Sequence, residues 1–173
     1  MRTTSLASRI AIYALLIALQ IILTRFLSIQ TPIVRIGFTF VPIAISGILF
    51  GPIVAGMLAA ISDVMGFFLN PVGTFHPGFI LSAFLSGGIY GLFLYRKNVT
   101  WLRIGLAALV IGLVVHIGLN SVWLSQIFVK GVWGLILARI PKEVVVFVVQ
   151  IPIIYIVWNA LKGSLKQYTQ MPK

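Results

Sequence analysis

Few side chains in this chain are able to do acid–base or metal chemistry. Among its 173 residues are two acids, Asp63 and Glu143, two histidines, His76 and His116, and no cysteine. The sequence has no Walker-type phosphate loop, no Ser-centred nucleophile elbow and no HExxH zinc motif. We therefore predict no catalytic residue, no metal site and no cofactor. Because serines and histidines lie within apolar runs, an intramembrane protease is kept as the alternative.

The basic residues point to a charged ligand. Thirteen Lys and Arg oppose the two acids, which gives a net charge of +11. They stand singly between apolar runs, without the basic stripe or arm typical of nucleic-acid-binding proteins. The arginine fork matches a carboxylate with two parallel hydrogen bonds, so we predict an anionic small molecule and no nucleic acid. Snorkelling of each side chain, or an i, i+4 pair between Arg139 and Glu143, would be simpler explanations. The candidates are Arg25, Arg35, Lys130 and Arg139, with Lys142 beside the last.

Other polar residues are suited to the edge of a flat ring. Asp63 lies about ten residues into an apolar run, where an ionisable side chain is a functional candidate by default. Its carboxylate could pair with a buried cation, or it could accept from two adjacent N–H donors of a ligand. Asn120 offers both donors and acceptors, and His116 lies one turn before it.

Aromatic residues and a loop rich in Gly and Pro lie near these candidates. Thr74, Phe75 and His76 follow Asn70 in a segment framed by two prolines and two glycines. Such a loop can gate a pocket, although a simple turn has the same composition. Phe75 and Trp123 could stack on a flat ligand, or they could belong to an aromatic belt at a membrane interface.

The elements that position these residues are predicted to be membrane helices. The chain is 60% apolar and only 9% charged, with a mean hydropathy of +1.12, whereas soluble chains are about 45–50% apolar and about 25% charged. A bilayer core requires about 20 apolar residues per helix. The first run is long for a signal peptide and no cleavage site follows it, so it is interpreted as a retained span. We predict an all-α protein with six spans: Leu6–Leu27, Phe38–Phe50, Pro52–Leu69, Pro77–Tyr95, Trp101–Gln126 and Ala138–Leu161.

Two features define the predicted topology. Gly51-Pro52 is a strong turn signal, so the run around it is interpreted as two antiparallel helices rather than one kinked helix with a buried segment. With six spans both termini share a side, and eight basic residues fall on that side against five on the other. The positive-inside rule then places both termini in the cytoplasm. The five cations on the outer side exceed what that rule explains, which favours an anionic ligand entering from outside.

Small residues form a stripe on the first span. Ala7, Ala11, Ala14 and Ala18 recur at spacings of four, three and four residues, so they line one face and allow another helix to approach closely. Gly56 and, four residues later, Ala60 repeat the spacing in the third span. The stripe could pack inside the bundle or could dock on another membrane protein.

These features together resemble a known family. The first-span motif Ala14-Leu-Leu-Ile-Ala18 and the stretch GFTFVPIAISGILFGPIVAGMLAAISD, which begins at Gly37, are similar to the substrate-binding S components of energy-coupling-factor (ECF) vitamin transporters. Arg25 after Leu-Thr, followed later by Asn70-Pro-Val-Gly-Thr-Phe-His-Pro-Gly, looks most like the folate-specific branch. The resemblance covers nearly the whole chain, which we treat as one six-helix domain, residues 1–173, with the S-component fold.

The resemblance implies a function beyond what the residues indicate. S components of this kind capture a vitamin outside the bacterial cell membrane and join a membrane-embedded coupling protein and two cytoplasmic ATPases. Folate has a flat pterin ring and a tail with two carboxylates; Asp63 or Asn120 would suit the ring and the basic residues the tail. By resemblance, Ala14 and Ala18 would face the coupling protein. An S component for pantothenate or a thiamine-like vitamin, or a proton-coupled carrier with Asp63 or Glu143 as relay, are the alternatives.

Overall fold

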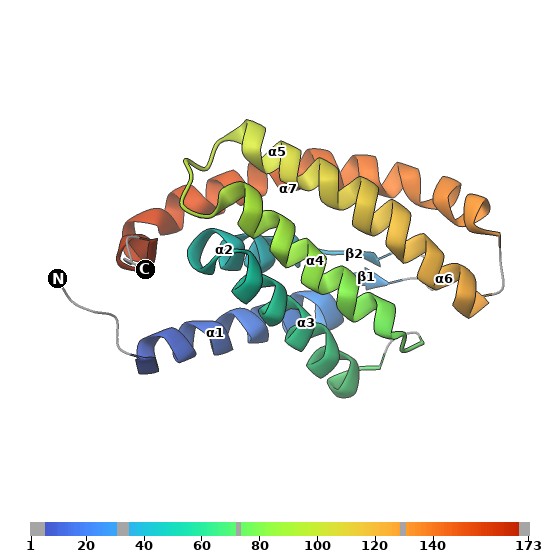
Figure 1. The fold of residues 1–173 in the computed structure, drawn as a ribbon, viewed down its shortest axis with the longest axis horizontal. Helices are drawn as coiled ribbons and strands as arrows, with labels where there is room; N and C mark the ends of the chain where they lie inside the picture. Colours follow the sequence, from blue (N-terminus) through green and yellow to red (C-terminus); the bar gives the residue numbers. More distant parts are fainter. Residues whose placement is uncertain (1–5, 31–34, 72–73, 129–130, 170–173) are drawn as a thin grey trace.

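The structure, a computed structural model, describes residues 6–30, 35–71, 74–128 and 131–169; the side chains of 30, 35 and 166–169 lie outside the description. The described part is helical apart from one pair of two-residue strands (Figure 1). The elements are α1 (Leu6–Ile21), the π-helical turn η1 (Ile22–Phe26), β1 (Ile29–Gln30), β2 (Arg35–Ile36), α2 (Phe40–Phe50), α3 (Pro52–Leu69), α4 (Pro77–Leu94), α5 (Trp101–Val110), the π-helical η2 (Ile111–Leu119), α6 (Asn120–Phe128) and α7 (Val132–Thr169).

Within the described residues, five helical stretches are long and apolar enough to cross a membrane, and α2 is a shorter apolar helix. The five are Leu6–Phe26, Pro52–Leu69, Pro77–Leu94, Trp101–Phe128 and Val132–Leu165. The prediction of an all-α membrane protein is therefore confirmed. The 11 residues of α2 rise only about 16 Å, roughly half of a bilayer core of about 30 Å. Nearly every residue of α2 from Pro42 to Leu49 is buried by the surrounding helices.

The prediction for the last span and the loop before it was wrong in its limits. A loop was expected between the spans that end at Gln126 and begin at Ala138, but α6 continues to Phe128 and α7 begins at Val132. The apolar residues after Val132 continue the helical pattern, and the prolines at 141 and 152 are accommodated inside α7, which curves along its length (Figure 1). Arg139 and Lys142 therefore lie about two turns inside the helix, instead of at its start.

The turn at Gly51 joins two helices, as predicted. Gly51 has φ +84° and ends α2, and Pro52 begins α3 directly after it. Glycine is favoured here because other residues rarely adopt a positive φ. Close packing continues onto α4, where a Cβ at Gly91 would collide with the backbone of Pro52 and one at Gly47 would lie 2.8 Å from the Gly91 nitrogen.

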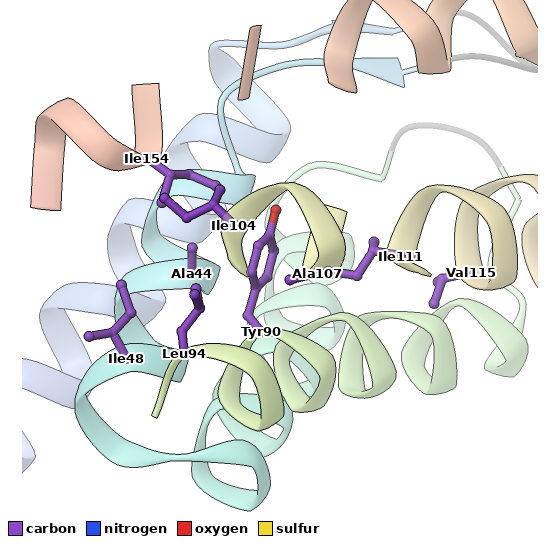
Figure 2. Packing of buried hydrophobic residues seen from close by; sticks show 9 residues of the cluster. All are labelled: Ala44, Ile48, Tyr90, Leu94, Ile104, Ala107, Ile111, Val115 and Ile154. Carbon is purple, nitrogen blue, oxygen red and sulfur yellow. The ribbon is translucent and has the colours of Figure 1, made fainter. Parts of the chain in front are cut away.

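A buried apolar cluster holds α2, α4, α5, η2 and α7 together. Figure 2 shows its members around Tyr90: Ala44, Ile48, Leu94, Ile104, Ala107, Ile111, Val115 and Ile154. A second cluster of Leu16, Ile45, Leu49 and Leu58 joins α1, α2 and α3. The clusters fix the helices that surround a cavity, and Tyr90, Ile111 and Val115 of the first cluster also line it.

The connections are divided between two ends of the molecule. The start of α1, the end of α7 and the α4–α5 connection lie at one end (Figure 1). The β1–β2 pair, the α3–α4 connection, the end of α6 and the start of α7 lie at the other end. In the strand pair Ile29 is opposite Ile36, and Gln30 is opposite Arg35. This division agrees with the six-span topology predicted from the sequence, in which both termini share a side.

Candidate ligand-binding site

A cavity of about 560 Å³ is bounded by residues from α1 and η1, α2, α3, α4, η2, α6 and α7. Ligand pockets commonly have volumes of about 300–1,000 Å³. It lies toward the end that carries the strand pair and the α3–α4 connection. Of the ligand-binding residues predicted from the sequence, seven line it: Arg25, Asp63, Thr74, Phe75, His76, Asn120 and Arg139.

An ion pair joins the end of the first span to the third. Arg25 Nη2 lies 3.3 Å from Asp63 Oδ1 and 3.3 Å from the Asp63 backbone oxygen. The Arg25 side chain is only 3% exposed, and its guanidinium lies 5.8 Å from the centre of the Phe67 ring. Asn70 donates from Nδ2 to the Arg25 backbone oxygen at 3.1 Å. Of the two interpretations of Asp63 considered from the sequence, the structure therefore shows the pair with a buried cation.

A second charged group, the α7 cluster, consists of Arg139, Lys142 and Glu143 together with His116 of η2. The two oxygens of Glu143 contact His116 Nδ1 at 3.0 Å and Lys142 Nζ at 2.6 Å. No ion pair joins Arg139 to Glu143 in the described part of the chain, so the i, i+4 pair considered from the sequence is absent there. Arg139, His116 and Lys142 line the cavity, whereas Glu143 lies behind them.

The α3–α4 connection is held against α6. His76 Nδ1 accepts from the Gly78 backbone N–H at 3.0 Å, which caps the start of α4, and Nε2 lies 3.0 Å from Gln126 Oε1. The His76 ring stacks on Trp123 at 5.4 Å between centroids, and Trp123 donates from Nε1 to Ser82 Oγ. The loop therefore forms a braced wall of the cavity.

Sequence reasoning missed a set of neutral polar residues on helix interiors. Gln20, Ser86, Tyr90 and Gln150 line the cavity and are buried, and Tyr90 donates to Gln150 Oε1 at 3.2 Å. Their signal in the sequence is a polar residue inside an apolar run, which is expensive in a membrane unless it has a partner or a ligand. A polar residue inside an apolar run does not indicate toward which helix its side chain points. Only the fold shows that these residues meet.

The remaining predicted residues lie elsewhere. Asn70 and Trp123 do not line the cavity. Asn70 contacts Arg25 and Trp123 contacts His76, and both of these partners line it. Lys130 and the side chain of Arg35 lie outside the described residues.

The small-residue stripe lies on the outside of the bundle. Ala7, Ala11, Ala14 and Ala18 are all exposed, while Leu16 and Gln20 on another face of α1 are buried. Packing inside the bundle therefore does not explain the stripe. The small residue Gly56 of α3, in contrast, packs inside the bundle, because a Cβ there would lie 2.8 Å from the backbone oxygen of Phe84 in α4.

A helical membrane protein whose bundle surrounds a cavity with buried polar and charged side chains belongs to the broad class of membrane-embedded binding proteins. Residues 8–158 match the family described as ECF transporter, substrate-specific component. The chain belongs to this family and is a membrane transporter component.

Relatives make the comparison more specific. The chain is 46% identical over 146 residues to a protein of Clostridium novyi named folate transporter FolT, covering 84% of this chain and 85% of that protein. It is 33% identical over 152 residues to a folate transporter FolT of Leuconostoc mesenteroides, covering 84% and 82%. A crystal structure of FolT bound with folic acid superposes with a TM-score of 0.83 at 37% identity, covering 88% of this chain and 93% of that one.

Proposed function

We propose that this chain is the folate-binding subunit of an ECF-type importer in a bacterial cell membrane. It captures folate from outside and hands it to a complex of one membrane-embedded coupling protein and two cytoplasmic ATPases, whose ATP hydrolysis drives uptake. Relatives named as folate transporters, and the similarity to a structure that contains folic acid, support folate over pantothenate or a thiamine-like vitamin.

The observation that carries the proposal is the composition of the cavity. It combines aromatic rings, buried neutral hydrogen-bonding groups and cationic side chains. Folate has matching parts: a flat ring with donors and acceptors, an aromatic linker and two carboxylates. Phe75 suits stacking and Asn120 suits the ring edge, as predicted from the sequence, and the cationic lining disfavours a cationic vitamin.

The exposed alanine stripe supports the docking part of the proposal. Ala7, Ala11, Ala14 and Ala18 leave a smooth face on α1 that another helix could approach closely. We assign this face to the coupling protein. The termini would then lie in the cytoplasm, with the cavity opening outward.

The direct test is ligand binding by the purified chain in detergent. Folate, pantothenate and thiamine are titrated separately by calorimetry, and folate is expected to bind in the nanomolar range, about −12 kcal/mol. Binding of another vitamin without folate would refute the assignment. Uptake driven by the membrane potential in cells that lack the ATPases would favour a proton-coupled carrier instead.

A further inference from the structure

The charges around the cavity are not equally matched. Arg25 is paired with Asp63, and Lys142 is paired with Glu143, so each of these cations has a carboxylate within 4 Å. Arg139 has no such partner within the described residues. We propose that Arg139 is the anion-binding group of the cavity and that it takes a carboxylate from the tail of the ligand. The proposal rests on the proposed function and names the part of the site that recognises the tail.

The surroundings of Arg139 fit an anion. The residue is 6% exposed, and its Nε and Nη1 atoms are buried without a hydrogen-bond partner among the described residues. A guanidinium carries five N–H donors and no acceptor, so a carboxylate is the group that uses these donors best. Arg25 also has a buried Nε without a partner, but its positive charge is already matched by Asp63.

Glu143 explains why the excess charge is located on Arg139. Although Glu143 is one turn further along α7, both of its oxygens are occupied by His116 and Lys142. Its negative charge is thus balanced locally, and it is held behind the cavity lining. Glu143 is in this sense a positioning residue: it anchors two lining side chains, and although its charge attracts that of Arg139, it makes its ion pairs with His116 and Lys142 and leaves the Arg139 donors open to a ligand.

An unpaired buried guanidinium also has a cost in the protein without ligand. Removing a buried ion from water without a partner is unfavourable, and natural sequences keep such groups where they serve a function. Replacing Arg139 by a neutral residue of similar length should therefore weaken binding of the carboxylate while maintaining or raising the melting temperature of the ligand-free protein. A purely structural arginine would lower the melting temperature.

The experiment compares folate with folate dimethyl ester, in which both carboxylates are masked. Affinities and ligand-free melting temperatures are measured for the unsubstituted chain, Arg139→Gln, Arg25→Gln and Arg103→Gln; Arg103 lies at the start of α5 outside the cavity and is the matched control. We expect the unsubstituted chain and Arg103→Gln to prefer folate over the ester by about tenfold or more.

Arg139→Gln should remove this preference, because it loses folate affinity while its affinity for the ester stays within about threefold of the unsubstituted chain. Arg25→Gln should weaken both ligands and keep the preference. Arg139→Lys, which retains the charge without the fork, should keep part of it.

Three outcomes would overturn the inference. The preference for folate could persist in Arg139→Gln; it could vanish in Arg25→Gln instead; or Arg139→Gln could melt at a lower temperature and lose both ligands equally, which would make Arg139 a residue of the fold. In each case folate binding by the unsubstituted chain leaves the proposed function standing. If the unsubstituted chain binds neither ligand, the proposed function fails, and the assignment of Arg139 fails with it.

Discussion

Arg25 and Arg139 carry the same charge but have different surroundings. From the sequence both were candidates for an anionic ligand, because both lie near the outer ends of predicted spans. The structure pairs Arg25 with Asp63, which is 38 residues away in the chain, and gives Arg139 no such partner among the described residues. The types of both residues could be interpreted from the sequence. Their difference could not, because the partner of Arg25 is on another helix and no local spacing reveals it.

The first prediction at this scale concerns Arg25→Ala. The substitution leaves the Asp63 carboxylate without its cation and removes a contact between η1 and α3; breaking a buried pair typically costs about 3–5 kcal/mol, and the partial exposure of Asp63 places the cost at or below the lower end. Folate binding is expected to weaken markedly, and the melting temperature to fall. Arg25→Ala combined with Asp63→Asn should recover part of the stability. If the double variant melts no higher than the single one, the pair is not the cause.

The second concerns the glycine at the start of α4. A Cβ at Gly78 would overlap the indole ring of Trp123, which stacks on His76. Gly78→Ala should displace the braced wall, destabilise the protein by about 1–3 kcal/mol and speed folate dissociation in stopped-flow measurements. Gly88→Ala is the matched control on the same helix, because a Cβ there makes only an ordinary contact at 3.8 Å with the oxygen of Pro52. Equal behaviour of the two variants would contradict this account.

At the scale of elements, the helices next to the cavity contain the irregularities. The first and fifth spans were predicted as regular helices, but η1 and η2 have π-helical geometry and carry Arg25 and His116 respectively. Each π-helical turn shifts the residues after it around the axis, which sets the direction of the side chains that follow, and such turns are frequent at functional sites. Apolar periodicity predicts where a helix lies. Apolar periodicity does not predict a local change from α-helical to π-helical geometry, because the apolar residues on either side are compatible with either geometry.

The exposed face of α1 supports a prediction for the element as a whole. Ala14→Trp or Ala18→Trp adds a large ring to the stripe without touching the cavity lining. Folate binding by the isolated chain should be unchanged within about threefold. Uptake by cells that contain the coupling protein and ATPases should be lost, because the approach of a second helix is blocked.

Val148→Trp, which places the same ring on the exposed face of α7, is the control and should leave uptake intact. Uptake that survives in both α1 variants would show that the stripe is not the docking face.

For the whole molecule, the sequence predicted the class, the approximate spans and the division of the loops between two ends. The limits were poorest between Gln126 and Ala138, where a loop was expected and the structure extends α6 to Phe128 and begins α7 at Val132. The cavity itself could not be predicted, because its lining includes isolated polar residues from α1, α4 and α7. These residues meet only through the packing of helices that are distant in the sequence.

The orientation of the molecule can be tested because the chain has no cysteine. Single cysteines are introduced as Pro71→Cys in the α3–α4 connection and Lys97→Cys in the α4–α5 connection, both at exposed positions. A membrane-impermeant maleimide should label Pro71→Cys in intact cells, but Lys97→Cys only after the membrane is opened, as the positive-inside rule requires. The reverse pattern would place the termini outside.

The short helix α2 has a consequence for biosynthesis. A segment of 11 residues rises too little to be held across a bilayer alone when it leaves the ribosome, and its ends would expose backbone groups to lipid. In the finished protein its flanks are covered by α1, α3, α4 and α7, all but one of which are translated after it. Because Gly51 joins α2 directly to α3, we expect the two helices to enter the membrane as one unit. We therefore expect the packing around α2 to be completed only after α7 has been synthesised.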